Sequence, residues 1–192
     1  MAVFKTVTFG YSNFITYTYA GKNFTPKSGF YADNGFNMLY AVHSYTIKMK
    51  QKEFNYVDIS TDSYIKWNTR NTNGIETNVH SIIPSVGLKI GMDLKNEIKV
   101  YATDYLPFDW QFSEQILIPS KQYTLHGNTL ILGSPQTHKW LYKFTLITDQ
   151  FYGGKRLAIQ PEFSNVLNNR FSIGTLYLFT HIQFPSDFSQ LG

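Results

Sequence analysis

The side chains best suited to acid–base and metal chemistry are the five histidines, and they are scattered along this chain of 192 residues. No two of them share a His-x-His spacing, and none belongs to a His-Glu-x-x-His motif, the patterns in which histidines bind zinc. There is no cysteine, so disulfides, thiolate metal ligands and a cysteine nucleophile are excluded. We therefore predict no metal site from the histidines, which are His43, His80, His126, His138 and His181.

Paired carboxylates are the next candidates, because a glycosidase needs two of them to converge across a cleft. Asp104 and Asp109, around the segment "YLPFDW", come nearest to such a pair, and a loop that leaves both in water accounts for them more simply. No Gly-x-Ser-x-Gly elbow, phosphate-binding loop or dinucleotide fingerprint occurs. The sequence thus predicts a protein that is not an enzyme, with no catalytic residue, no metal and no cofactor.

Aromatic side chains crowd the segment "TDYLPFDWQF" (103–112), where Tyr105, Phe108 and Trp110 are the candidate partner-contact residues. Aromatic rings of this kind anchor a protein partner or stack on sugar rings when they are exposed. They can equally cover one end of a hydrophobic core. The first interpretation makes a carbohydrate- or receptor-binding module the alternative function of this chain.

The composition is rich in aromatics and poor in charge. Aromatic residues make up 17% and charged residues 16%, against about 25% charged residues in average chains. Two interpretations remain open: part of the surface is covered in an assembly, or the chain is a β-domain with an uncharged polar surface. The net charge of +4 comes from scattered lysines, and arginine, the usual reader of bases, occurs at three positions only. Neither a nucleic-acid contact nor a membrane span is expected.

Period-two alternation of apolar and polar residues pervades the chain, as in residues 38–50 and 138–148. Helical periodicity is nearly absent, and no linker divides the sequence. We predict a single all-β domain over residues 1–192, an antiparallel two-sheet sandwich of jelly-roll type with long aromatic loops. Hairpin turns are expected at Gly127-Asn128 and at Gly153-Gly154.

The segment "FSIGTLYLFTHIQF" (171–184) contains neither a charged residue nor a proline. Its alternation places apolar side chains on both faces, which predicts one long strand with a bend or bulge at Gly174. A strand that is apolar on both faces needs cover on both sides, either from a second sheet or from another subunit.

Within this segment, Gly174, Thr175, Leu176, Tyr177 and Leu178 resemble the last long strand of single jelly-roll structural proteins of viruses. The resemblance implies a structural subunit of a virus particle: a capsid, minor capsid or decoration protein that assembles by protein–protein contacts. It also implies a homo-oligomer that meets other virion proteins, assembled in the cytoplasm or the nucleus of a host cell.

The chain departs from many small capsid proteins at its beginning. Those proteins carry an arginine-rich arm that neutralises the genome, whereas Lys5 is the one basic residue among the first twenty. Direct contact with nucleic acid is therefore not expected, which favours a surface, vertex or minor component of the particle, or a shell that fills without charge neutralisation. A bound glycan is compatible with each of these places in the particle.

Overall fold

The computed structural model describes residues 9–21, 35–68, 74–134, 139–168 and 171–185, which form strands and connections without a helix. The all-β prediction is confirmed. The strands in chain order are β1 Gly10–Ala20, β2 Phe36–Lys48, β3 Phe54–Asn68, β4 Ile75–Leu88, β5 Asp93–Tyr105, β6 Trp110–Ser113, β7 Ile116–Ile118, β8 Gln122–Thr124, β9 Gly127–Gly133, β10 Trp140–Phe151, β11 Gly154–Asn168, β12 Phe171–Leu176 and β13 Phe179–Gln183.

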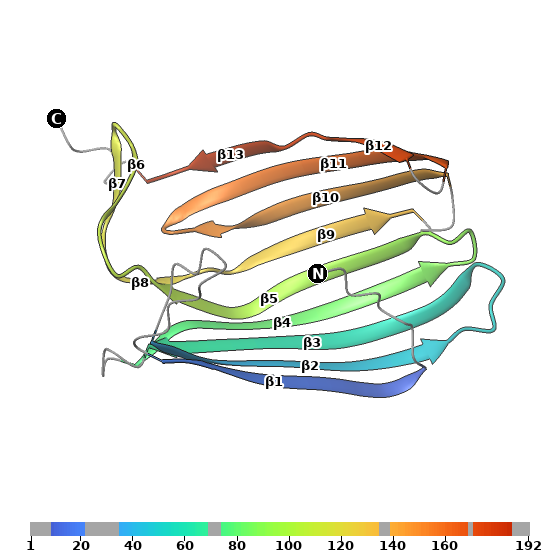
Figure 1. The fold of residues 1–192 in the computed structure, drawn as a ribbon, viewed down its shortest axis with the longest axis horizontal. Coiled ribbons are helices and arrows are strands. Elements are labelled where there is room, and N and C mark those ends of the chain that lie inside the picture. The colour runs from blue at the N-terminus through green and yellow to red at the C-terminus, as the bar shows by residue number, and fades with distance from the viewer. Residues whose placement is uncertain (1–8, 22–34, 69–73, 135–138, 169–170, 186–192) are drawn as a thin grey trace.

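Eleven of these strands form one antiparallel sheet (Figure 1). Its order is β1-β2-β3-β4-β5-β9-β10-β11-β12, with β8 beside β5 and β13 beside β11. Within the described ranges, the strands β6 and β7 pair only with each other and form a small second sheet at one end. Neighbours along this path follow chain order, as in a meander, so the jelly-roll part of the prediction is not confirmed.

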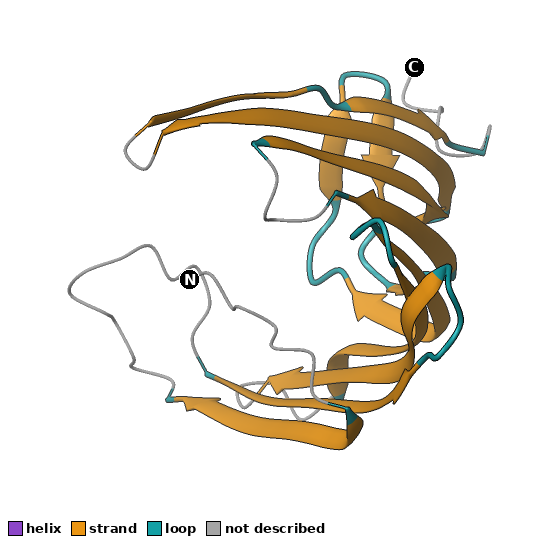
Figure 2. Cartoon of the chain, turned by 90° about the vertical axis from the view of Figure 1, so that its right-hand side faces the viewer, coloured by secondary structure: helices purple, strands orange, loops and turns teal. Residues whose placement is uncertain are grey.

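The large sheet curves so strongly that β1–β4 and β9–β12 face each other across its concave side (Figure 2). This arrangement is consistent with two layers of a sandwich that remain joined through β5. The strands β1 and β12 lie at the two ends of the curve, and Figure 2 shows them on opposite sides of its open mouth.

Successive side chains on each strand alternate between the concave and the convex face. On the central strands, Ser44, Thr46 and Asp58 share the crowded concave face and are buried. Their neighbours Tyr45 and Ile59 point to the convex face and are 51% and 54% exposed. Few apolar side chains are buried in the described residues: Ala20, Phe36, Ile83, Ala102, Ile118, Tyr123 and Ala158.

The predicted long strand 171–184 is divided in two, and the division does not fall at Gly174. β12 ends at Leu176 and β13 begins at Phe179, and both pair with β11. Between them the Tyr177 backbone N–H donates to the Pro161 carbonyl, at 3.1 Å. Because β12 lies at an edge of the sheet, Ile173 is 67% exposed and the expected cover on both faces is not found among the described residues.

Of the two predicted hairpins, one is found, with its turn at Tyr152-Gly153 and therefore one residue before the predicted Gly153-Gly154, and the other is wrong. β10 and β11 pair from Phe151 opposite Gly154, and the turn between them holds Tyr152 at φ 45° and Gly153 at φ 89°. The second of these positions suits a glycine. At Gly127 there is no hairpin, because β8 and β9 lie one after the other along β5 and do not pair with each other.

Gly127 instead permits a close approach between β9 and β10. A Cβ atom at this position would collide with Asp149 Cβ and lie 2.9 Å from Asp149 Cα. We expect Gly127→Ala to lower the free energy of unfolding by about 2 kcal/mol, because backbone must move to relieve the overlap. Gly133→Ala, on the same strand with nothing within 4 Å, is the matched control and should change stability little. Equal effects in urea denaturation would contradict this account.

Candidate functional site

The three aromatic residues of the segment 103–112 lie in different surroundings. Tyr105 ends β5 and is 40% exposed, whereas Phe108, in the connection to β6, is 66% exposed. Trp110 begins β6, and its ring contacts Phe151 and Tyr152 with centroids 6.1 and 5.9 Å apart. Trp110 thus holds the small sheet against the end of the large one, while Tyr105 and Phe108 present ring surface outward.

A pocket of about 240 Å³ opens beside Tyr105. The polar residues Asn68, Glu76 and Gln122 line it together with Tyr105 and Pro107. An aromatic ring next to amide and carboxylate groups is a combination that suits a polar, ring-shaped ligand.

The two carboxylates considered from the sequence each have structural partners. Asp104 accepts hydrogen bonds from the Thr77 hydroxyl, at 2.7 Å, and from the Tyr152 hydroxyl, at 2.6 Å. Burial raises the pKa of Tyr152, and its hydrogen bond to Asp104 raises it further. Asp109 accepts the backbone N–H of Ser120, at 2.6 Å. These contacts join neighbouring segments of the fold and describe no acid–base pair.

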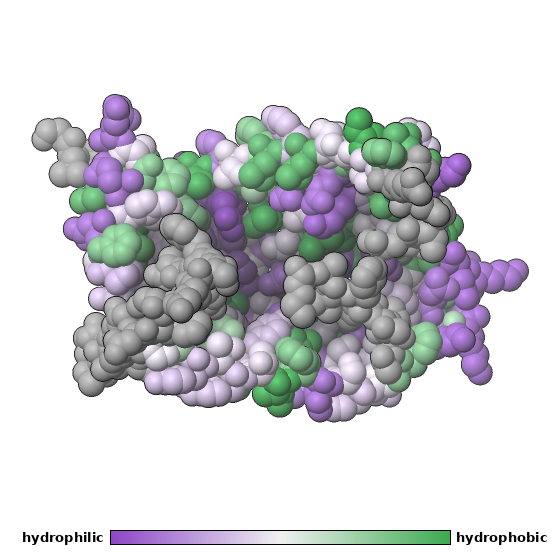
Figure 3. All heavy atoms as spheres, viewed as in Figure 1, coloured by the Kyte–Doolittle hydropathy of each residue, from purple (hydrophilic) through white to green (hydrophobic). Residues whose placement is uncertain are grey.

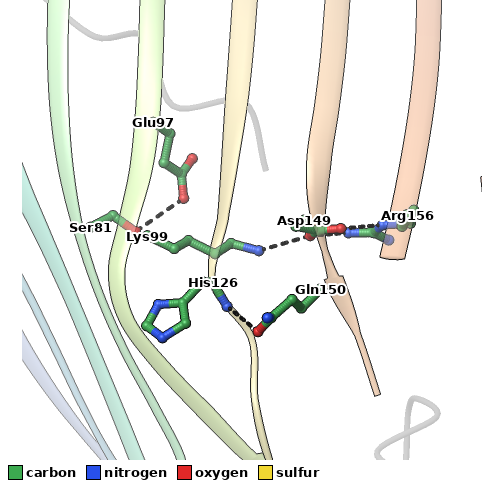
Figure 4. Close-up of polar contacts among 7 residues, drawn as sticks. All are labelled: Ser81, Glu97, Lys99, His126, Asp149, Gln150 and Arg156. Atoms are coloured by element: carbon green, nitrogen blue, oxygen red, sulfur yellow. Dashed lines mark hydrogen bonds and ion pairs between the residues drawn. The ribbon is translucent and has the colours of Figure 1, made fainter. Parts of the chain in front are cut away.

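The concave face carries a row of charged side chains that runs from β5 to β11. Lys99 lies opposite Gly127, which in turn lies opposite Asp149. Because Gly127 has no side chain, the Lys99 ammonium reaches over it to the Asp149 carboxylate, at 3.3 Å. From the other side, the Arg156 guanidinium donates two hydrogen bonds to the same carboxylate, at 2.7 and 2.5 Å (Figure 4).

Asp149 is the buried member of this row. Its side chain is 3% exposed, while those of Lys99 and Arg156 are 24% and 27% exposed. A buried carboxylate requires such partners, since an unpaired one would lose its hydration without compensation. The two cations keep contact with solvent on the concave side, so the row leaves positive charge accessible there. Ser81 extends the polar lining by donating to Glu97, at 3.3 Å (Figure 4).

A second carboxylate is buried where β2, β3 and β4 meet. Asp58 is 2% exposed and accepts hydrogen bonds from four hydroxyl groups. These donors are Ser44 at 2.6 Å, Thr46 at 2.5 Å, Ser60 at 2.9 Å and Ser85 at 3.3 Å. Hydroxyl groups satisfy the carboxylate oxygens in place of water, so the concave face is polar even where it is closed to solvent. Hydrophilic residues are visible within this hollow in Figure 3.

The convex face has the opposite character. The strand register places the charged strand residues on the concave side, and Glu76 pairs with one of them, Lys66. Among the described strands the exception is Lys155, beside the β10–β11 turn. Hydrogen bonds on the convex face join histidine and hydroxyl groups: His43 Nδ1 bonds to the Tyr11 hydroxyl at 2.7 Å, and His80 Nδ1 to the Ser63 hydroxyl at 2.9 Å. Aliphatic and aromatic side chains occupy much of the remainder, so this face is nearly free of charge among the described strands.

The sequence analysis missed this division, although its signal is present in the printed sequence. In residues 93–99 the charged side chains Lys95, Glu97 and Lys99 occupy one parity, and Leu94 and Ile98 occupy the other. The same separation holds in β3, where Asp58 and Asp62 occupy one parity and Val57 and Ile59 occupy the other. The parity of charged residues along the strands would have predicted one face that carries the charge and one that is nearly free of it. The described residues contain no group of three histidine, aspartate or glutamate side chains that could hold a metal.

Asp62, on the concave face, gives this site a pH dependence. Burial raises the pKa of its carboxyl above the ordinary value, the nearby Glu97 adds to the rise, and the Tyr40 hydroxyl and Lys95 oppose it. A carboxyl with a higher pKa in the folded chain binds its proton more tightly when folded. Stability from this group is therefore present at low pH and is lost as the pH rises through the folded pKa.

We expect Asp62→Asn to unfold at a higher temperature than the wild type at pH 7, with a difference that shrinks toward pH 3. At pH 3 the wild-type carboxyl is protonated and resembles the amide. Thermal unfolding at several pH values measures this difference. A variant that is less stable than the wild type by the same amount at every pH would contradict the assignment.

Comparison with known proteins supplies no relative from which function could be transferred. No family model, no curated protein and no solved structure matches this chain. In the part of the chain that the structure describes, no helix is long and apolar enough to cross a membrane. Function must therefore be argued from the two faces and the edges of the sheet.

Proposed function

We propose that this chain is a structural subunit that works by association with other protein chains, as a component of a virus particle would. The observation that carries the proposal is the convex face, which is nearly free of charge among the described strands and on which large apolar side chains remain exposed. The narrower, viral form of the proposal rests on the sequence resemblance of residues 174–178 to viral jelly-roll strands alone, because in the structure β12 ends within this segment, at Leu176. On this view the protein has no catalytic role.

Exposure on the convex face extends over successive strands. Ile59 of β3, Ile82 of β4 and Ile98 of β5 are 54%, 38% and 38% exposed. Phe144 of β10 and Leu157 of β11 continue the face and are each 39% exposed. Soluble monomers rarely leave contiguous apolar areas of more than a few hundred Å² in water, and larger ones mark interaction sites.

The direction of the amphipathicity adds to this argument. A single antiparallel sheet facing water on one side normally turns its polar residues to that side. Here the charged residues line the hollow and the uncharged residues form the outer surface. Protein interfaces are depleted in charge and enriched in aromatic side chains at their centre, which matches the convex face.

Association through the convex face predicts a specific sensitivity to charge. We expect the wild-type chain to form oligomers in analytical ultracentrifugation and Ile59→Lys to weaken them by about tenfold or more, since an interface must desolvate the new ammonium. Ile90→Lys is the matched control, because Ile90 is also exposed, at 66%, but lies outside the strands in the β4–β5 turn. A wild-type chain that stays monomeric, or that instead sediments with phosphatidylcholine vesicles, would overturn the proposal.

The pocket beside Tyr105 favours a second candidate function, a carbohydrate-binding module. Its ring surface and the neighbouring groups of Asn68, Glu76 and Gln122 offer stacking and hydrogen bonding at one place. If the pocket binds sugars, Tyr105→Ala should abolish binding on a glycan array. Tyr177→Ala is the control and should leave binding unchanged, because it removes a tyrosine that is 63% exposed in the connection between β12 and β13. An array without hits for the wild type would exclude this candidate.

A further inference from the structure

The outer edge of β1 has none of the features that normally prevent strand pairing. Natural edge strands are kept apart by lysine, proline, bulges or shortness. β1 is 11 residues long, contains no charged residue and no proline, and pairs with β2 without a bulge from Gly10 to Ala20. Among the described residues no strand pairs with its other edge. That edge therefore presents a regular ladder of backbone donors and acceptors.

The opposite edge of the same sheet is a poor partner for it. Nine strands lie along the path from β1 to β12, and each runs antiparallel to the next, so the first and the last run in the same direction. Pairing β1 with β12 would create a parallel ladder in a sheet that is otherwise antiparallel, and parallel pairs are slightly less stable. The edge formed by β12 and β13 is also interrupted between Leu176 and Phe179.

We propose that β1 pairs antiparallel with β1 of a second copy of this chain, about a twofold axis near Ile15. This inference rests on the proposed function, because it names the partner and one of the surfaces through which the subunit associates. A twofold contact uses the same patch on both copies, so the strand must be complementary to itself. Antiparallel pairing continues the ladder of the sheet from one copy into the next.

The residues of β1 meet this condition. With Ile15 opposite its own copy, Tyr11 lies opposite Tyr19 and Ser12 lies opposite Thr18. Aromatic pairs and pairs of hydroxyl side chains are favourable directly across strands, and no like charges meet because the strand has none. Tyr11, Ile15 and Tyr19, on the convex side, are 60%, 61% and 65% exposed, so each gains cover from the second copy.

The absence of cysteine makes this register directly testable. We expect Ile15→Cys to form a disulfide-linked dimer under mild oxidation, since side chains directly opposite have Cβ atoms within about 5.5 Å. Tyr11→Cys should not link to its own copy, because eight residues at about 3.4 Å each would separate the two thiols. A mixture of Tyr11→Cys and Tyr19→Cys chains should link to each other. Ile173→Cys, equally exposed on β12, is the control and should remain unlinked.

A second variant distinguishes pairing through the β1 edge from association through the convex face. Thr16 points to the concave side of β1, so Thr16→Lys leaves the convex surface unchanged and places a charge in the edge, which opposes pairing. We expect it to raise the dissociation constant of the dimer by about tenfold or more, with thermal unfolding of the monomer unaltered.

The outcomes distinguish this inference from the proposed function. If the wild-type chain associates, but Thr16→Lys leaves its mass distribution unchanged and Ile15→Cys forms no disulfide, the β1 edge is not the interface. Association through the convex face would then stand alone. If the wild-type chain is monomeric at every concentration in ultracentrifugation, both the inference and the proposed function fail.

Discussion

The constraint on which the rest of this structure depends is the alternation of side chains between the two faces of one continuous, curved sheet. Each strand sends alternate side chains to two faces, and in the described residues no second layer covers the convex one. Curvature crowds the concave side chains together and spreads the convex ones apart. The few buried apolar residues, the buried carboxylates and the exposed isoleucines all follow from this geometry.

On the concave face, polar interactions consequently connect the strands, a role that buried apolar side chains fill in most folds. Asp149 joins β5 to β11 across two intervening strands, and Asp58 collects hydroxyl groups from three strands. Such networks stabilise only when every member has a partner, because an unsatisfied group in a closed site costs more than an apolar one. The first network also depends on a missing side chain, because β9 presents Gly127 between Lys99 and Asp149.

Alternation along each strand was sufficient to predict an all-β antiparallel fold, since it is a local property. The order of strands in the sheet is not local, and for that reason the jelly-roll prediction, which requires particular distant pairings, had no support in the pattern. Gly127 illustrates the difficulty. A glycine followed by asparagine is typical of a hairpin turn, yet here the glycine is needed for its missing side chain, as the neighbour of Asp149 on the next strand. A sequence alone does not distinguish these two uses.

The high aromatic content of the chain also has two interpretations as long as the faces of the sheet on which the rings lie are unknown. In one group of rings, Trp110 and Phe112 pack against Phe151, Tyr152 and Phe184 at the end of the sheet, where they replace solvent with each other. In another, Tyr11 and Tyr19 stand on an uncharged outer face and an open edge. Both groups contribute to the high aromatic content from which covered surface was predicted. Only the second group remains exposed in the part of the chain that the structure describes, and its regular backbone edge and uncharged side chains are the features on which the proposed pairing with a second copy depends.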